Sequence, residues 1–147
     1  MLLLGVGILG WAGWQYWGTN TVSKALHKKI AASVIEDWKY GRVPKEGIAL
    51  LRIPRFGSDF EVPVLNGDDP QTLSRGVGRY ENGAEPGQIG NLVLSGHRVT
   101  HGEPFRNFLK LRKGDEVVVE TRTHIYTYVL QQNGDETRVP FTTSWPL

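Results

Sequence analysis

One stretch of the sequence decides the fold: Leu94-Ser95-Gly96-His97-Arg98-Val99-Thr100-His101-Gly102-Glu103-Pro104-Phe105. The apolar residues from Asn91 to Leu94 predict a β-strand that brings His97 to its end. A turn containing glycine follows, and Pro104 then begins a predicted helix, because proline is favoured in the first helical turn. A histidine at the end of a strand can face a cleft, so this stretch also holds the first candidate for chemistry.

Outside this stretch, residues 47–147 predict a mostly β domain with short helices. Five segments have the apolar, turn-bounded pattern of strands: 48–53, 62–64, 91–97, 116–120 and 124–131. The last two are predicted to form a hairpin around Arg122. Short helices are predicted from Asp69 to Arg75, with Asp69 as the cap, and from Pro104 to Leu111. This pattern favours a barrel or a sandwich, but about five strands would leave open edges in a barrel. The sequence therefore predicts a β domain that is unfinished.

The charged residues are unevenly distributed, which limits the possible partners. The chain contains no cysteine, so disulfides and thiolate metal sites are excluded. Residues 18–46 hold six Lys or Arg against three Asp or Glu, a net of +3, whereas residues 47–147 hold eleven against twelve, a net of −1. Nucleic-acid binding needs a basic surface on the folded domain. The near-neutral domain argues against nucleic acid, and the basic segment beside an apolar one favours a membrane surface.

Residues 1–17 are apolar and uncharged, and we expect them to form a transmembrane anchor. As a helix they would reach roughly 25 Å, against a hydrocarbon core of about 30 Å. The aromatic residues at their far end resemble an interfacial belt and are Trp11, Trp14, Tyr16 and Trp17. A cleaved signal peptide and a buried helix are the alternatives, although a signal peptide would need a positive start and a small-residue cleavage site.

Residues 18–46 are expected to form a juxtamembrane helix and linker, with the helix from Thr21 to Trp38. Its apolar residues recur every four positions and predict one stripe: Val22, Leu26, Ile30, Val34 and Trp38. Three lysines follow the apolar segment: Lys24, Lys28 and Lys29. By the positive-inside rule they favour a cytoplasmic domain, which conflicts with the extracellular placement inferred below.

His97 is the leading candidate for proton transfer, because imidazole titrates near neutral pH. A purely structural histidine is the alternative. We expect His101 to contact the start of the predicted helix, and Glu103 to be stabilised by the free N–H groups there. His97 and His101 could form half of a metal site, but no third ligand lies at a supporting spacing.

Other polar residues carry weaker signals. His27 on the predicted helix and His124 at a strand start suggest no chemistry. Ser144 lacks an adjacent base and the G-x-S-x-G elbow, so we do not expect a serine nucleophile. The loop from Glu81 to Gly87 is rich in glycine but has no Walker lysine, which argues against a phosphate site.

Four stretches, in this order, resemble the sortase family and, within it, the class E group of actinobacteria. They are Leu51-Arg52-Ile53-Pro54; Val62-Pro63-Val64 with Asn66-Gly67; Gly76-Val77-Gly78-Arg79-Tyr80 running to Pro86-Gly87-Gln88-Ile89-Gly90-Asn91; and the opening stretch, 94–105, with Leu111-Arg112-Lys113-Gly114-Asp115-Glu116. The most specific part is Gly96-His97-Arg98 followed by Thr100-His101-Gly102-Glu103-Pro104-Phe105. The lead-in Gln15-Tyr16-Trp17-Gly18-Thr19-Asn20 is similar to the class E membrane-proximal segment.

The resemblance implies a single-pass membrane protein with an extracellular cysteine transpeptidase domain, an eight-stranded closed β-barrel. In such enzymes a cysteine thiolate attacks the Thr–Gly bond of a Leu-Ala-x-Thr-Gly or Leu-Pro-x-Thr-Gly signal, and a peptidoglycan-precursor amine resolves the acyl-enzyme. A histidine protonates the leaving amine, and an arginine steadies the oxyanion. The resemblance implies that His97 is this histidine and that Tyr80 lies at the signal pocket, with no metal or cofactor.

The sequence departs from the family on its C-terminal side, where the Thr-Leu-x-Thr-Cys strand and the later arginine strand have no counterpart. Residues 141–145 match the segment before them, so Ser144 does not replace the cysteine. We therefore expect a sortase barrel truncated of its last strands, inactive by itself and prone to aggregate through an open edge. A non-catalytic, membrane-tethered sortase-like peptide-binding module is one alternative, and a metal-dependent hydrolase using His97 and His101 is another.

Overall fold

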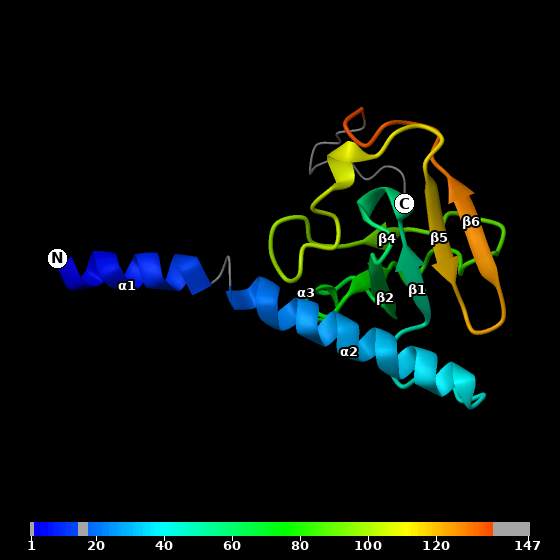
Figure 1. Cartoon of the computed structure of the whole chain (residues 1–147), viewed down its shortest axis with the longest axis horizontal. Helices are drawn as coiled ribbons and strands as arrows, with labels where there is room; N and C mark the ends of the chain where they lie inside the picture. Colours follow the sequence, from blue (N-terminus) through cyan, green and yellow to red (C-terminus); the bar gives the residue numbers. More distant parts are fainter. Residues whose placement is uncertain (1, 15–17, 137–147) are drawn as a thin grey trace.

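The computed structural model of the 147-residue chain describes residues 2–14 and 18–136. Its centre is one curled sheet of six strands in the order β4-β3-β2-β1-β5-β6 (Figure 1). The strands are β1 (Ala49–Arg52), β2 (Glu61–Asn66), β3 (Val77–Arg79), β4 (Leu94–Ser95), β5 (Glu116–Glu120) and β6 (Ile125–Val129). The helices are α1 (Leu2–Gly13), α2 (Thr19–Lys39) and α3 (Pro70–Leu73), with the 3-10 helices η2 (Pro54–Phe56) and η3 (Phe108–Lys110).

The strands β2 and β3 run parallel, and every other neighbouring pair in the sheet is antiparallel. A parallel pair needs a connection that crosses over, and α3 lies in that connection. Asp69 caps α3, because its carboxylate accepts hydrogen bonds from the N–H groups of Gln71 (2.9 Å) and Thr72 (3.1 Å). The helix predicted at Asp69 is therefore confirmed.

The predicted hairpin is also confirmed. Strands β5 and β6 pair from Glu116 opposite Val129 to Glu120 opposite Ile125. The N–H of Thr121 donates to the carbonyl of His124 at 2.8 Å and closes the turn. This turn is tight enough to set the register of the two alternating strands.

Strand β3 was not predicted, because three residues with a glycine in the middle show no alternation. Gly78 is required there by close packing, since a Cβ atom would lie 2.2 Å from the carbonyl oxygen of Gly67. Strand β4 is shorter than the predicted strand 91–97 and holds only two residues. Within residues 2–14 and 18–136 the sheet is an open curl with β4 and β6 at its ends, rather than the expected closed barrel.

The sheet has an apolar core on each face, because successive side chains of a strand point to opposite sides. On the face away from α2, the larger core comprises Ala49, Leu51, Ile53, Val62, Val64, Val77, Leu111 and Val119. On the other face, Leu50 packs with Ile30, Ala31 and Val34 of α2. Helix α2 is thus packed against the sheet as part of the folded unit (Figure 1).

The predicted helix 21–38 is confirmed as α2, but its predicted apolar stripe is correct only in part. Ile30 and Val34 are buried, whereas Val22 is 59% exposed. In its first half the helix buries polar residues: Asn20, Ser23 and His27. This half of α2 faces the loop of residues 97–105, whose backbone N–H and C=O groups need hydrogen-bond partners. Polar side chains can supply these partners, and valine cannot.

The helix predicted from Pro104 to Leu111 is wrong. The segment makes successive turns in which Arg106, Phe108 and Leu111 each donate to the carbonyl three residues before them. Only Phe108–Lys110 forms a 3-10 helix. Asn107 in the middle of the segment favours turns over α-helix, and Phe105 and Leu111 are placed against the core by this tighter path.

Helix α1 stands apart from the sheet (Figure 1). It has 12 residues, and large apolar side chains on or beside it are exposed: Val6, Ile8, Leu9, Trp11 and Trp14. Among the described residues, no helix combines the length and apolar character needed to cross a bilayer. Residue 1 and residues 15–17 of the expected anchor lie outside the described part of the chain.

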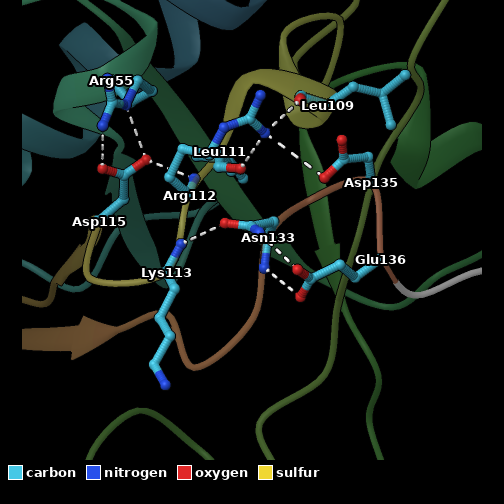
Figure 2. Close-up of polar contacts among 9 residues, drawn as sticks. All are labelled: Arg55, Leu109, Leu111, Arg112, Lys113, Asp115, Asn133, Asp135 and Glu136. Atoms are coloured by element: carbon cyan, nitrogen blue, oxygen red, sulfur yellow. Dashed lines mark hydrogen bonds and ion pairs between the residues drawn. The ribbon is translucent and has the colours of Figure 1, made fainter.

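A polar network ties the turn after β6 to the start of β5 and to η2 (Figure 2). Arg55 donates two hydrogen bonds to the carboxylate of Asp115, at 2.8 Å and 2.6 Å. The backbone N–H of Lys113 donates to the side chain of Asn133 at 2.9 Å, and Asn133 in turn donates to Glu136. These contacts fix residues 131–136 against the rim of the sheet.

Candidate active site

His97 lies two residues beyond β4, in a loop that folds back on itself. Its side chain is partly buried, and its carbonyl accepts a hydrogen bond from the N–H of Phe105 at 3.1 Å. Within the loop, the N–H of Glu103 donates to the carbonyl of Thr100 at 3.1 Å. These two bonds close the loop, so residues 97–105 form one compact unit carrying the imidazole.

Three consecutive residues of this loop have left-handed backbone conformations. The φ angles are 52° at His101, 82° at Gly102 and 53° at Glu103. This conformation costs an ordinary residue about 1–2 kcal/mol, whereas glycine adopts it readily. The strain at His101 and Glu103 must therefore be offset by contacts, as is common at functional sites.

His101 is an aromatic neighbour of His97 in the same loop. Their rings stack with centroids 4.5 Å apart and an interplanar angle of 30°. Thr100 lies between them, with its Oγ1 at 3.4 Å from Nδ1 of His97 and at 3.1 Å from Nδ1 of His101. The expected contact of His101 with a helix start is wrong, because no helix begins at Pro104.

Burial, and after it the charge of His101, lowers the pKa of His97 below its ordinary value. The imidazole is therefore mostly neutral at pH 7 and can accept a proton. A thiolate placed beside it would act in the opposite direction and favour the protonated ring, which can then donate to a leaving group.

His27 is a third histidine at this site, although its sequence pattern suggests no chemistry. Its side chain is buried in α2, and a Cβ atom on Gly102 would lie 2.5 Å from its Cε1. Burial lowers the pKa of His27 to about 4, although the hydrogen bond that its ring donates to the backbone of Ser74 acts in the opposite direction. The charges of His101, His97 and Lys24 make smaller contributions that also lower this pKa. Among the described residues, no partner binds its Nε2.

One sequence signal could have identified this side chain. Asn20, Ser23 and His27 follow the spacing of one helical face, continuous with Ile30 and Val34. A polar run that continues an apolar stripe indicates a helix that passes from a core onto backbone polar groups. Val22, which the predicted stripe includes, lies on a different, exposed face of α2.

Glu103 is a buried carboxylate with two cationic partners. It accepts from Lys24 Nζ at 3.1 Å and from Arg106 Nη1 at 3.0 Å. The predicted role at a helix N-terminus is wrong for the same reason as at His101. The ion pair with Lys24 instead links the loop to α2.

Tyr80 is not brought together with His97. Its N–H donates to the carbonyl of Val93 at 3.1 Å, which extends the pairing of β3 with β4 by one residue. His97 follows Val93 by four residues, which along an extended strand separates the two positions by roughly 13 Å. Tyr80 lines a separate pocket of about 380 Å³ with Asn82 and Ile89.

An apolar hollow of about 430 Å³ lies on the face of the sheet away from α2. Its wall includes Leu94 and Phe105, which flank the histidine loop, together with Leu51, Val119 and Leu130. The loop that carries His97 therefore begins and ends at the edge of this apolar hollow.

The remaining candidates lie away from this site. His124 is exposed on the β5–β6 turn, and Ser144 lies outside the described residues. In the part of the chain that the structure describes, no group of three or more His, Asp or Glu side chains could hold a metal ion. The stacked rings of His97 and His101 present their faces to each other, which is no ligand geometry.

Comparisons with known proteins agree with the sequence pattern. A sequence model of the Sortase domain matches residues 51–143. Sortase SrtE1 of Streptomyces coelicolor is 39% identical over 137 residues, covering 84% of this chain and 38% of SrtE1. The chain thus spans well under half the length of this relative.

Two solved structures have similar folds. Sortase E from Streptomyces avermitilis is 46% identical, with a TM-score of 0.56, over 57% of this chain and 55% of that one. Sortase E1 from Streptomyces coelicolor, with a tripeptide in its active site, is 42% identical, with a TM-score of 0.53, over 59% and 57%. Both matches exceed a resemblance of fold alone, because the sequences agree over the same regions.

Proposed function

Because the chain belongs to the sortase family, and resembles its class E members most clearly, we propose that it carries the histidine part of a transpeptidase site. The reaction would cleave the Thr–Gly bond of a Leu-Ala-x-Thr-Gly or Leu-Pro-x-Thr-Gly signal and join the protein to a cell-wall amine. The observation that carries the proposal is a partly exposed imidazole, that of His97, held on a strained loop beside an apolar concavity.

In this proposal a thiolate attacks the threonine carbonyl carbon, and the C–N bond to glycine breaks. His97 gives a proton to the leaving amine, and later takes one from the amine of the peptidoglycan precursor that attacks the thioester. These 147 residues hold no cysteine, so the sulfur must come from outside them. The chain by itself is then inactive as a transpeptidase.

The peptide nature of the substrate is supported by the comparison with Streptomyces coelicolor Sortase E1, which was solved with a tripeptide in its active site. Tyr80 is proposed to contact the signal only at a distance from His97, because the two side chains lie on opposite ends of the β3–β4 pairing. A role for Tyr80 in binding the N-terminal side of the signal fits this separation.

The test compares the 147-residue chain with a longer product of the same gene that includes a cysteine. Each is incubated with a Leu-Ala-x-Thr-Gly peptide and an amine acceptor, and products are followed by mass spectrometry. We expect no cleavage by the short chain, and thiol-dependent cleavage by the longer product that falls by about 10²–10⁴-fold with His97→Ala. His124→Ala, an exposed histidine, is the matched control and should keep full activity.

Two results would contradict this proposal. One is cleavage by the 147-residue chain that persists after alkylation of all thiols. The other is a longer product whose activity is unchanged by His97→Ala.

A second candidate function follows from the absence of cysteine in this chain. A membrane-tethered module that binds sorting signals without cleaving them would use the same loop and concavity. Saturable binding of the peptide by the 147-residue chain, together with a natural stop codon after Leu147 and stable expression, would favour this function. A cysteine encoded in frame would favour the transpeptidase.

We also propose that residues 1–17 hold the protein at the cell membrane, with the β domain outside. The support is the uncharged apolar run and the exposed apolar side chains of α1. Fractionation of cells that express residues 1–147 or 18–147 tests the anchor, and protease treatment of intact cells tests the side. Protection of the β domain in intact cells would favour the opposite topology, which Lys24, Lys28 and Lys29 predict.

A further inference from the structure

We propose that Asn20, at the start of α2, is a positioning residue that fixes the loop carrying His97. This inference rests on the proposed role of His97 and deepens it, because it assigns a part of the site to the helix that follows the N-terminal segment. Asn20 lies nearly eighty residues away from the loop in sequence and touches no reacting group.

The geometry at Asn20 is a two-point clamp. Its side-chain Nδ2 donates to the carbonyl of Val99 at 3.1 Å, and its Oδ1 accepts from the N–H of Gly102 at 3.0 Å. Asn20 is only 7% exposed, and its hydrogen bond with the N–H of Gly102 is buried, whereas the one with Val99 is partly buried. The two backbone groups lie on either side of Thr100 and His101, and the clamp therefore spans the turn that stacks His101 on His97.

An amide is the side chain suited to this task. It carries a donor and an acceptor on one short planar group, whereas a carboxylate only accepts and a hydroxyl cannot reach two separated backbone groups. Removal of the amide would take this partner away from the carbonyl of Val99 and from the buried N–H of Gly102, and leaving a buried N–H without a partner is costly. The loop would then have to open toward water to satisfy them.

Two further contacts from α2 act on the same turn. Lys24 pairs with the buried carboxylate of Glu103 at 3.1 Å, and His27 packs its ring against Gly102. Asn20, Lys24 and His27 lie at helical spacing on one face of α2. They hold the three left-handed residues, and this offsets the strain that the loop backbone carries.

A role in positioning differs from simple packing in its effect on His97. If the clamp fixes the stack of His97 on His101, loss of the clamp must change the proton affinity of His97, because burial and the nearby ring both act on it. If Asn20 only attaches the helix to the domain, its removal lowers stability but leaves the titration of His97 unchanged.

The experiment uses the full 147-residue chain with isotope-labelled histidine and follows the His97 ring signals by NMR from pH 4 to pH 8. With Asn20→Ala we expect the His97 midpoint to rise toward the ordinary value of about 6.5. We also expect amide exchange at Gly102 to accelerate by roughly five- to tenfold, as for the loss of one protected hydrogen bond. Val22→Ala, on the exposed side of the same helix, is the matched control and should change neither.

Asn20→Ser covers the case in which Asn20→Ala does not fold, because its hydroxyl can satisfy one of the two backbone groups. It should raise the His97 midpoint by a smaller amount. A folded Asn20 variant with the His97 midpoint of the unmodified chain overturns the inference. That result leaves the proposed transpeptidase untouched, and a longer gene product without cleavage activity would leave the clamp untouched, since the titration requires no catalysis.

Discussion

At the scale of single residues, His27 and Gly102 explain how the histidine loop is held. The imidazole of His27 occupies the space that any side chain at Gly102 would need. Gly102 in turn supplies the N–H that Asn20 binds. The ring of His27 therefore fits only if residue 102 has no side chain, and substitution of either residue should have a measurable effect.

The free energy of unfolding of the chain should decrease as the pH is lowered from 6.5 to 4, because of His27. Its folded pKa is about 4 and its ordinary value is 6.5, so below pH 6.5 the unfolded chain binds a proton that the folded chain excludes. Above pH 6.5, His27 has no effect on the free energy of unfolding. As the pH falls from 6.5 to about 4, His27 lowers this free energy progressively, by on the order of 2–3 kcal/mol at pH 4. His27→Gln should flatten this part of a urea-unfolding series.

The matched control for this pH dependence is His124→Gln, since His124 is exposed. It should leave the slope between pH 4 and pH 6.5 unchanged. An equally steep slope in the His27→Gln chain would show that other groups cause the acid sensitivity.

Gly102→Ala should destabilise the chain more than Gly114→Ala. Both glycines have positive φ, 82° and 91°, but a Cβ atom on Gly102 meets His27, whereas one on Gly114 has no atom within 4 Å. Each substitution carries a backbone cost of about 1–2 kcal/mol, and Gly102→Ala adds the clash with a buried ring. Thermal unfolding of both variants measures the difference, and equal losses would contradict the contact.

At the scale of elements, the contacts between α2 and the loop resemble those between η2 and the start of β5. In both places a polar side chain from one element binds the backbone or carboxylate of another. Arg52 adds a third case, since its guanidinium joins Glu61 of β2 at 2.6 Å to Glu120 of β5 across β1. Polar cross-links thus hold the curl of the sheet where its apolar cores end.

Asp115→Asn should weaken the network shown in Figure 2. The hydrogen bonds from Arg55, and then from the Arg112 N–H, lower the pKa of Asp115 to about 2 from an ordinary value of 3.8. The ionised carboxylate therefore stabilises the fold above pH 3.8, and this contribution is lost as the pH falls toward 2. We expect a lower Tm at neutral pH, and a smaller difference between variant and unmodified chain at pH 2.

Asp135→Asn is the control for this change. Its pairing with Arg112 is longer, at 3.5 Å, and both side chains are half exposed. Exposed pairs of this kind contribute little, so Tm should remain nearly constant. A larger loss for Asp135→Asn than for Asp115→Asn would contradict the assignment of the network to Asp115.

At the scale of the whole molecule, the described chain is a sheet with one face covered by α2 and the other open to a hollow of about 430 Å³. An open apolar hollow favours association, as do the end strands β4 and β6, which pair with no further strand among residues 2–14 and 18–136. The expected tendency to aggregate remains a prediction that measurements of the purified chain can decide.

Removal of residues 1–46 should destabilise the domain far more than removal of residues 1–17. The longer deletion uncovers Leu50 and removes its partners on α2, and each fully buried aliphatic side chain contributes about 1.5–3 kcal/mol. Residues 18–147 should unfold cooperatively in urea, whereas residues 47–147 should show a shallow transition and bind a hydrophobic dye. Equal midpoints for the two fragments would show that α2 is dispensable.

The sequence by itself determined the local features of this protein. The alternating residues of β5 and β6 predicted their hairpin, Asp69 predicted the cap of α3, and the strand before His97 predicted where the imidazole emerges. Each of these depends on neighbours within a few residues, so a linear pattern is sufficient to specify it.

Only the tertiary structure decided which distant groups meet at the site. It placed His27 and Asn20 against the loop, separated Tyr80 from His97, and converted the segment after Pro104 into turns. The first two outcomes depend on backbone N–H and C=O groups of one element that need hydrogen-bond partners on another. The third depends on the limited space in the core, into which Phe105 and Leu111 fit only if the segment between them forms turns. The periodicity of α2 cannot predict its contacts with the carbonyl of Val99 or the N–H of Gly102, because these groups reach α2 only when the sheet has folded.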